Sequence, residues 1–206
     1  VIFALRVVRV VIMRDAEKTR QKILDISADE IHKNGFKATS LSVILERCEI
    51  SKGALYYHFT NKLELGYAVF EDVFVPMFIA TWQPALEVED PIEGLCDFFK
   101  AMCNEMSCDE AVCGCPLNNL CEEMANVDEG FRLRILNMQE QLNTLISTNL
   151  QKISVQLRDD VDYSQVAYFI VATFHGAINL SKSSRNKELF QKVIAELCRY
   201  ILNLKK

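Results

Sequence analysis

The sequence predicts an all-α fold, and three observations support that class. Glycine and proline are scarce, with seven and four in 206 residues, which disfavours an architecture of many short strands and turns. Half of the residues are hydrophobic, so the chain can bury a substantial core. Apolar residues also recur at helical spacing through most of the chain. Long helices with short connections are therefore expected.

The first expected helix covers residues 14 to 34 and stops at Gly35, a residue that commonly ends helices. The twelve residues before Met13 are apolar but include two arginines, are too short to span a bilayer and lack a small-residue cleavage site. They are expected to be neither a membrane anchor nor a signal peptide. Because Met13 directly precedes the first helix, residues 1–12 are expected to be a non-native or disordered extension.

Two short helices are expected next. Thr39 and Ser40 can cap the first of them, which ends near Cys48. Ser51 can cap the second, which covers Lys52 to Phe59. Two short helices joined by a turn of three or four residues are typical of a helix-turn-helix.

A longer helix is expected from Asn61, with a kink or a stop at Pro76, because proline removes an amide and clashes with the preceding turn. Asp90-Pro91 predicts the start of a helix that reaches about Met106. The segment 107–116 is the poorest helix candidate beyond that point. Further helices are expected over 117–125, 128–157, 163–182 and 186–204.

The formal net charge of −5 is unevenly distributed along the chain. Residues 13–65 hold nine Lys and Arg against eight Asp and Glu, whereas residues 66–206 hold twelve against twenty. A surface that attracts phosphate can therefore exist on the N-terminal part of an acidic chain.

The second short helix has features suited to nucleic-acid binding. Its N-terminus at Ser51 presents free amides and partial positive charge, which suits a phosphate. Gly53 leaves the first turn without a side chain, so that the backbone can approach DNA closely. Tyr56 and Tyr57 lie about 100° apart on a helix, so the two side chains cannot both pack against the core. Their hydroxyls, and the ring of His58, can donate to phosphate oxygens.

Taken singly, such aromatic and basic residues more often form core and solvated surface, but in register they favour binding. The stretch GFKATSLSVILERCEISKGALYYHFTNKLEL resembles the DNA-binding signature of the TetR family of transcription regulators. The resemblance implies DNA contacts from the first short helix by Thr39, Ser40 and Ser42. It implies that three residues face the major groove: Lys52, Gly53 and Ala54. It also implies that four residues hold the DNA backbone: Tyr56, Tyr57, His58 and Lys62.

Two positions depart from the family pattern. Glu49 stands in the turn where such sequences often have glycine, and Leu63 stands where an acid is common. Few of the implied contact residues are good base readers, so DNA shape is expected to supply much of the specificity.

These features predict a helix-turn-helix DNA-binding domain at residues 13–65 and a helical ligand-binding and dimerisation domain at residues 66–206. The predicted function is that of a repressor that binds double-stranded operator DNA as a homodimer. A small apolar or electrophilic inducer in the C-terminal domain would release it.

Dimerisation is expected through the last two helices, because one helix-turn-helix reads only a few base pairs. Their apolar rows can form a four-helix bundle with a second copy: Val166, Phe169, Ile170, Thr173, Ala177, Val193, Leu197 and Ile201. The alternative is that these rows close the core of the monomer.

An apolar inducer pocket is expected among the middle helices. Its candidate lining residues are Phe78, Trp82, Phe99, Met102, Met106, Phe131 and His175. Ordinary core packing is the alternative for these residues. A hydrogen-bonded interior position is favoured over ligand contact for His175.

The chain has eight cysteines and no clear secretory signal, which indicates a reducing compartment, so the cytoplasm is the predicted location. Five of them gather in one stretch: Cys103, Cys108, Cys113, Cys115 and Cys121. Zinc binding is disfavoured there, because no histidine or paired CxxC accompanies them.

The motif Gly114-Cys115-Pro116-Leu117, with Gly176 and Lys182 downstream, resembles a TetR subgroup that includes the repressor of N-ethylmaleimide reductase. In that subgroup a cysteine after this glycine senses electrophiles or oxidants, which implies that Cys115 is the sensing thiol here. A helix N-terminus at Leu117 and the charge of Lys182 would both lower the pKa of Cys115. The alternative is a tight structural turn with a buried, inert sulfur.

Catalysis is not expected. The sequence shows no paired carboxylates, no nucleophile with its base and no glycine-rich phosphate loop, and three histidines offer little acid–base chemistry. No cofactor, metal or membrane partner is expected. The alternative function is a helical ligand- or metal-binding protein without operator function, which a steep salt dependence of DNA binding would exclude.

Overall fold

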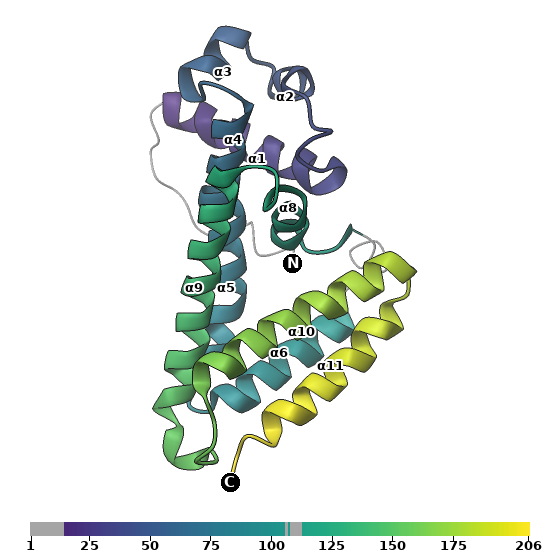
Figure 1. Cartoon of the computed structure of the whole chain (residues 1–206). Helices are drawn as coiled ribbons and strands as arrows, with labels where there is room; N and C mark the ends of the chain where they lie inside the picture. The colour runs from purple at the N-terminus through teal and green to yellow at the C-terminus, as the bar shows by residue number, and fades with distance from the viewer. Residues whose placement is uncertain (1–14, 106, 108–112) are drawn as a thin grey trace. The chain divides into compact units, whose positions relative to one another are not determined.

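The computed structural model describes residues 15–105, 107 and 113–206. In this part of the chain the regular structure is helical, apart from one isolated β-bridge, and the predicted all-α class is confirmed (Figure 1). The expected extension at residues 1–12 lies outside the described residues.

The chain divides into two compact units. The N-terminal unit combines the chain up to Met77 with Asn119–Arg134, and the C-terminal unit combines Phe78–Asn118 with Ile135–Lys206. The predicted boundary after residue 65 falls instead inside a continuous helix. A boundary drawn at one point of the sequence misses this arrangement, because each unit is assembled from two separate stretches of the chain.

The N-terminal unit begins with four helices: α1 (Asp15–Asn34), α2 (Leu41–Cys48), α3 (Lys52–His58) and α4 (Lys62–Val69). The three short ones each begin at a side-chain cap. Each capping oxygen accepts a hydrogen bond from the amide three residues later, and the capping residues are Ser40, Ser51 and Asn61. Local hydrogen bonds therefore set the starts of the predicted helix-turn-helix.

The chain passes from α4 into α5 (Val75–Leu86) through one π-helical turn, η2 (Phe70–Phe74). The amide of Val75 donates to the carbonyl of Phe70, five residues earlier. Proline lacks an amide and crowds the carbonyl four residues before it, and this wide turn accommodates Pro76. The expected disturbance at Pro76 is thus a π turn, and the chain remains helical.

An aromatic cluster forms part of the core of the N-terminal unit. The Phe131 ring, at the start of α9 (Glu129–Lys152), lies 5.3 Å from the Phe36 ring and 4.9 Å from the Tyr67 ring, centroid to centroid. Phe70 packs on the same ring at 6.3 Å. These contacts join α9 to α4 and to the turn after α1.

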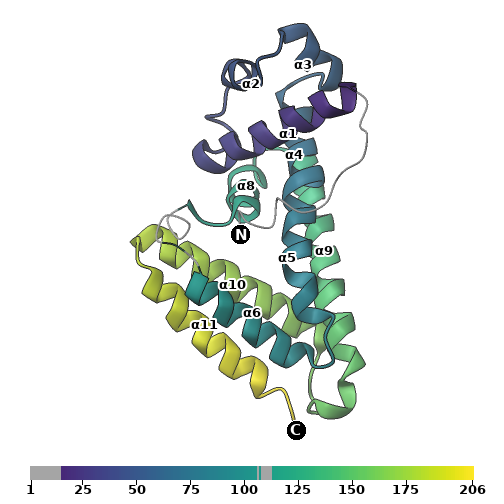
Figure 2. The same ribbon diagram turned by 180° about the vertical axis from the view of Figure 1, so that it is seen from behind.

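In the C-terminal unit α6 (Pro91–Glu105), α10 (Tyr163–Ser184) and α11 (Lys187–Leu202) lie side by side in both Figure 1 and Figure 2. Large rings fill much of the core of this unit: Phe78, Trp82, Phe98, Phe99, Phe174 and Phe190. Two further elements are α8 (Pro116–Met124), which continues into the N-terminal unit, and the short 3-10 helix η3 (Ser154–Gln156).

Most expected helix boundaries agree with the observed ones to within a few residues. The helix expected over 128–157 ends at Lys152 and is followed by η3, and α5 extends to Leu86, well beyond the kink or stop expected at Pro76. None of the helices in the described ranges is both long and apolar enough to cross a membrane.

Candidate nucleic-acid interface

The turn between α2 and α3 depends on a left-handed backbone at Glu49. Its φ and ψ are 55° and 41°, and its amide donates to the carbonyl of Glu46. The following amide, of Ile50, donates to the carbonyl of Leu45. Glycine adopts this conformation most easily, which explains the glycine expected at this position. Glutamate holds it at a cost of about 1 kcal/mol.

α3 has one buried and one exposed face. Leu55 and Phe59, four residues apart, are buried in the N-terminal unit. Tyr57 is 78% exposed and Tyr56 is 41% exposed. The ammonium of Lys52 lies 5.7 Å from the centroid of the Tyr56 ring, so a cation and two phenols share this surface.

The first turn of α3 is open. A Cβ built on Gly53 would meet only the hydroxyl of Ser51, at 3.9 Å. Lys52 is exposed and Ala54 half-buried, and half-buried His58 at the other end of the helix packs edge-on against the ring of Tyr57. A phosphate or a base edge can therefore reach the backbone of this turn.

The hydroxyl groups of Thr39, Ser40 and Ser42, at the start of α2, differ in exposure and in hydrogen bonding. Ser40 and Ser42 are exposed, with hydroxyls 2.9 Å apart. Thr39 is 3% exposed and its hydroxyl donates to the carbonyl of Gly35. Thr39 therefore stabilises the turn after α1, and the DNA contact implied for it does not match its position. Val43, beside Ser42, is exposed and was not singled out from the sequence.

Lys62 also has a different position from the one expected. Its ammonium donates to the carbonyl of Lys37 at 3.0 Å and lies 4.7 Å from the centroid of the Phe36 ring. Burial lowers the pKa of Lys62, against a smaller effect of Glu123. The ammonium is thus engaged within the protein rather than directed at DNA. Lys37 itself is exposed just before the α2 cap and joins the candidate interface in its place.

Glu123 of α8 holds the same turn from the other side. Its carboxylate accepts hydrogen bonds of 2.7 Å from the amides of Phe36 and Lys37. Gly35 has a φ of +82°, and a Cβ there would come within 3.1 Å of this carboxylate. Glu123 was missed from the sequence, because it lies far along the chain from its partners and no local pattern connects them.

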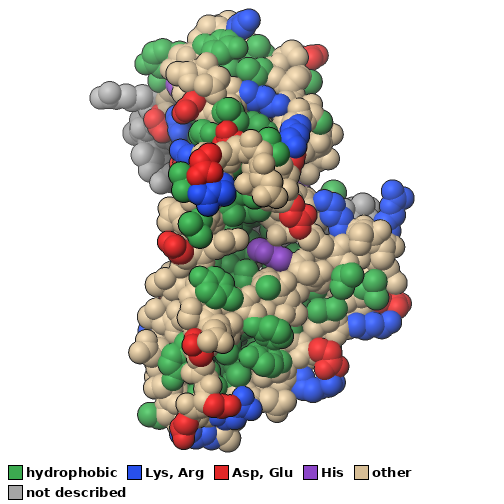
Figure 3. All heavy atoms as spheres, viewed as in Figure 1, with side chains coloured by type: hydrophobic (Ala, Val, Ile, Leu, Met, Phe, Trp, Pro, Cys, Tyr) green, Lys and Arg blue, Asp and Glu red, His purple; other side chains and the backbone are tan. Residues whose placement is uncertain are grey.

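The candidate interface is mixed in charge. In Figure 3 the basic side chains of the N-terminal unit are interspersed with acidic and hydrophobic ones. Arg47 of α2 is paired with Asp29 and Glu30 of α1. Lys37 and Lys52 are therefore the basic residues that we assign to the interface.

The residues predicted to line an inducer pocket do not form one group. Phe78, Trp82 and Phe99 are buried in the aromatic core of the C-terminal unit. Phe131 belongs to the core of the N-terminal unit. Core packing, the alternative considered for these residues, accounts for their positions.

His175 and Met102 are half-buried, and the His175 ring lies 5.5 Å from the Phe78 ring. Met106 lies outside the described residues. An open groove of about 530 Å³ lies between α5 and α9 and includes none of the predicted lining residues. Its lining residues are Ile79, Asn137, Glu140, Gln141, Thr144 and Leu145.

Cys115 precedes α8, and burial of its sulfur raises its pKa to about 11. Hydrogen bonds from the amides of Asn118 and Leu117 oppose this shift, as expected at a helix N-terminus. The predicted lowering of the pKa is nevertheless wrong, because burial outweighs the amides and Lys182 is not among the groups that shift it. No metal-binding cluster of three His, Cys, Asp or Glu side chains occurs within the described ranges.

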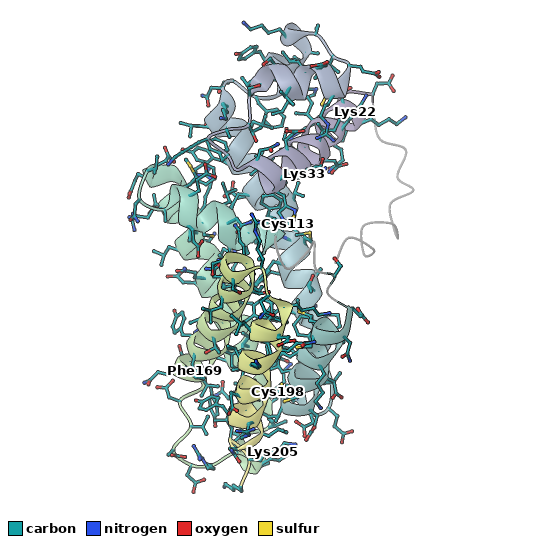
Figure 4. The ribbon with its side chains drawn as sticks, turned by 90° about the vertical axis from the view of Figure 1, so that its right-hand side faces the viewer. Lys22, Lys33, Cys113, Phe169, Cys198 and Lys205 are labelled. Carbon is teal, nitrogen blue, oxygen red and sulfur yellow. The ribbon has the colours of Figure 1, made fainter. Side chains whose placement is uncertain are left out.

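α10 and α11 expose an apolar face that includes Phe169 of the predicted rows but otherwise consists of other residues. Five residues of those rows are buried inside the subunit: Val166, Ile170, Ala177, Leu197 and Ile201. The exposed face consists of Tyr168, Phe169, Ala172, Gly176, Leu180 and Tyr200. Phe169, labelled in Figure 4, packs on Tyr200 with ring centroids 4.5 Å apart.

A capped helix-turn-helix with an exposed second helix, joined to a larger helical unit, defines a DNA-binding transcriptional regulator. Residues 23–69 match the family model of bacterial regulatory proteins of the tetR family. Residues 91–196, more than half of the chain, match the C-terminal domain of LmrA/YxaF-like transcriptional regulators. The chain belongs to the TetR family and is a regulator rather than an enzyme.

Two curated relatives align over most of their length. The HTH-type transcriptional regulator in the lacX 3′ region of Lactococcus lactis subsp. lactis is 26% identical over 84% of this chain and 88% of its own. The HTH-type transcriptional repressor DhaR of Mycobacterium sp. (strain GP1) is 24% identical over 82% of this chain and 85% of its own.

Solved structures share the fold. A TetR-family transcriptional regulator from Cytophaga hutchinsonii has a TM-score of 0.83 at 23% identity, over 94% of this chain and 98% of its own. Reduced NemR from E. coli has a TM-score of 0.77 at 21% identity, over 91% and 97%. Both likenesses show the fold alone, so the thiol-sensing resemblance stays a prediction.

Proposed function

We propose that this chain is a cytoplasmic repressor that binds a two-fold operator as a homodimer and leaves it when the C-terminal unit receives a signal. The observation that carries the proposal is the surface of α3, where Lys52, Tyr56 and Tyr57 are exposed while Leu55 anchors the helix. The name of the relative DhaR, a repressor, supports the direction of control.

In this proposal the open first turn of α3 approaches the major groove with Lys52, Gly53 and Ala54. The phenols of Tyr56 and Tyr57 donate to phosphate oxygens on either side. Positively charged Lys37 would act from the turn before α2. Since hydroxyls and cations bind phosphate in any sequence, the shape of the groove would supply much of the discrimination.

The test uses the full chain and labelled DNA from the region upstream of its own gene, with fluorescence anisotropy at several salt concentrations. Operator binding predicts an affinity that falls steeply with salt and exceeds that for unrelated DNA. Tyr57→Ala should weaken binding by roughly tenfold without loss of stability, because the ring is exposed. Val155→Ala, at an exposed residue of η3, is the matched control. Equal affinity for both DNAs would contradict the proposal.

The exposed face of α10 and α11 supports the dimer, since an apolar surface of this kind is typical of an interface between subunits. Phe169→Asp should give monomers in sedimentation equilibrium and should weaken operator binding, whereas Val155→Asp should do neither. A Phe169→Asp protein that remains dimeric would place the interface elsewhere.

Modification of Cys115 is a second candidate for the signal, beside a small apolar or electrophilic ligand. The supporting observation is the hydrogen bonding of its thiol to the amides of Asn118 and Leu117 in α8. The same helix carries Glu123, which holds the turn before α2. An adduct at the start of α8 could therefore displace that turn.

N-ethylmaleimide applied to the DNA complex tests this candidate. Release should be slow at neutral pH, because burial raises the pKa of Cys115 and leaves little thiolate, and it should be faster in mildly alkaline buffer. Cys115→Ser should abolish release, whereas Cys113→Ser should retain it. If the Cys115→Ser protein is released at the wild-type rate, the candidate fails, and operator binding stands on its own test.

A further inference from the structure

α6 and α11 run antiparallel and are joined at both ends by polar contacts. Near one end the side-chain amide of Gln191 donates a hydrogen bond to the backbone carbonyl of Cys103 at 3.2 Å. At the other end the ammonium of Lys205 donates to Asp90 at 2.6 Å and to Glu93 at 2.8 Å. These contacts fix the axial register of the two helices, and Figure 4 labels Cys198 on α11, above Lys205.

Cys96 of α6 and Cys198 of α11 face each other between these two sets of contacts. The Cys96 thiol donates to the carbonyl of Cys198 at 3.8 Å, and the Cys198 thiol donates to the carbonyl of Cys96 at 3.9 Å. Each sulfur therefore contacts the backbone of the other cysteine, so the two residues occupy adjoining positions on facing helices, as the two halves of a disulfide must.

We propose that Cys96 and Cys198 form a redox-active pair that a peroxide converts into a disulfide between α6 and α11. This inference concerns the C-terminal unit and does not depend on the proposed operator function. It is also separate from Cys115, which belongs to a different part of that unit.

The chemistry balances with one peroxide. The thiolate of one cysteine attacks a peroxide oxygen, the O–O bond breaks, and a sulfenic acid and water form. The second thiol then attacks the sulfenic sulfur, the S–S bond forms, and the hydroxide leaves with a proton as a second water. Two thiols are oxidised by two electrons, and one hydrogen peroxide is reduced to two water molecules.

The surroundings indicate which sulfur reacts first. The contact with Cys198, together with burial, raises the pKa of Cys96, so Cys96 is the thiol that remains protonated. Cys198 is 7% exposed and Cys96 is not exposed at all. Lys100, one turn further along α6, favours the thiolate of both. Because Cys198 is the more exposed of the two sulfurs, we assign it as the attacking thiolate and Cys96 as the thiol that resolves the sulfenic acid.

The test exposes the full chain to hydrogen peroxide, blocks remaining thiols with iodoacetamide and identifies linked peptides by mass spectrometry without reduction. A peptide pair joining Cys96 to Cys198, lighter by two hydrogens and separated by dithiothreitol, is the expected result. Cys96→Ala and Cys198→Ala should each abolish that pair, whereas Cys48→Ala, at a buried cysteine of the N-terminal unit, should leave its yield unchanged.

Circular dichroism of each variant distinguishes loss of the disulfide from loss of the fold. The wild-type measurement tests the proposal by itself, without any variant. The proposal is overturned if wild-type protein carries iodoacetamide or a sulfinic acid on both residues and no link. It is also overturned if Cys198 forms its disulfide with Cys103 instead of Cys96.

Discussion

The carboxylate of Glu123 accepts a hydrogen bond of 2.7 Å from the amide of Phe36, and through it α8 fixes the turn that leads into the helix-turn-helix. The adjoining amide of Lys37 donates to the same carboxylate. Without this acceptor the partly buried amide of Phe36 would lose its partner, which costs about 1–3 kcal/mol. The α2 helix begins only a few residues later, so its position depends on this contact.

Glu123→Ala should therefore lower the free energy of unfolding by about 1–3 kcal/mol in urea denaturation. It should also weaken DNA binding, because Lys37 and Ser40 lose their fixed positions. Glu140→Ala removes the same charge from an exposed position of α9 and is the control. Equal losses in the two variants would mean that charge, rather than the bond to the turn, matters.

Lys52 and Lys62 are predicted to differ in the salt dependence of DNA binding. Lys52→Gln should reduce the slope of log affinity against log salt by about one, because one phosphate contact is lost. Lys62→Gln should leave the slope unchanged and reduce stability by about 1 kcal/mol, since its ammonium is bound to the Lys37 carbonyl. Anisotropy titrations at four salt concentrations measure both slopes. A reduced slope for Lys62→Gln would return that residue to the DNA interface.

Glu49→Gly should stabilise the protein by about 0.5–1 kcal/mol, because glycine relieves the left-handed strain but is more flexible when unfolded. Glu49→Ala removes the same carboxylate and keeps the Cβ, so it should bring no such gain. Urea denaturation of the three proteins makes the comparison. A matching gain in Glu49→Ala would assign the effect to charge instead of backbone conformation.

The contact of Lys205 with Asp90 is predicted to make stability depend on pH. Burial acts to raise the pKa of Asp90, but the hydrogen bond from Lys205 and those from the amides of Glu93 and Ile92 outweigh it, so the pKa is lowered below 3.8. A carboxylate with a lowered pKa stabilises the fold above its unfolded pKa and loses that contribution as the pH falls through the folded value.

Lys205→Met should consequently lower the free energy of unfolding by about 1 kcal/mol at neutral pH. The effect is modest because the side chains of Lys205 and Asp90 are both partly exposed. The difference from wild type should shrink as the pH falls below about 3.8. Thermal denaturation between pH 7 and pH 3 provides the curves, with Lys18→Met, whose partner Asp15 is fully exposed and lies 3.9 Å away, as the control. If the difference in stability between the two proteins stays constant with pH, then packing of the Lys205 methylene groups stabilises the fold, rather than the ion pair.

The helices and their caps could be predicted because their signals are local. Ser40, Ser51 and Asn61 each cap a helix whose first residues they adjoin. The roles of Thr39 and Lys62 could not be predicted in this way. Whether these two side chains point into the protein depends on the turn after α1, and that turn is held by a residue more than eighty positions away.

The pKa of Cys115 illustrates the same limit. Its place before a helix was predicted, with the N-terminus expected at Leu117 and observed at Pro116. The burial that reverses the sign of the shift comes from the packing around the sulfur, which no spacing in the sequence specifies. The register of the exposed face on α10 also depends on packing, since Val166 and Ile170 are buried whereas Tyr168 and Ala172 are exposed.

Gly176 lies on that exposed face, and nothing approaches within 4 Å of the position where its Cβ would be. Within one subunit an added methyl group meets no obstacle, and replacing a mid-helix glycine by alanine gains about 1 kcal/mol of helix stability. A methyl group at residue 176 should therefore stabilise the isolated subunit. Any loss of stability or of association that it causes would show how near a second molecule comes to this position.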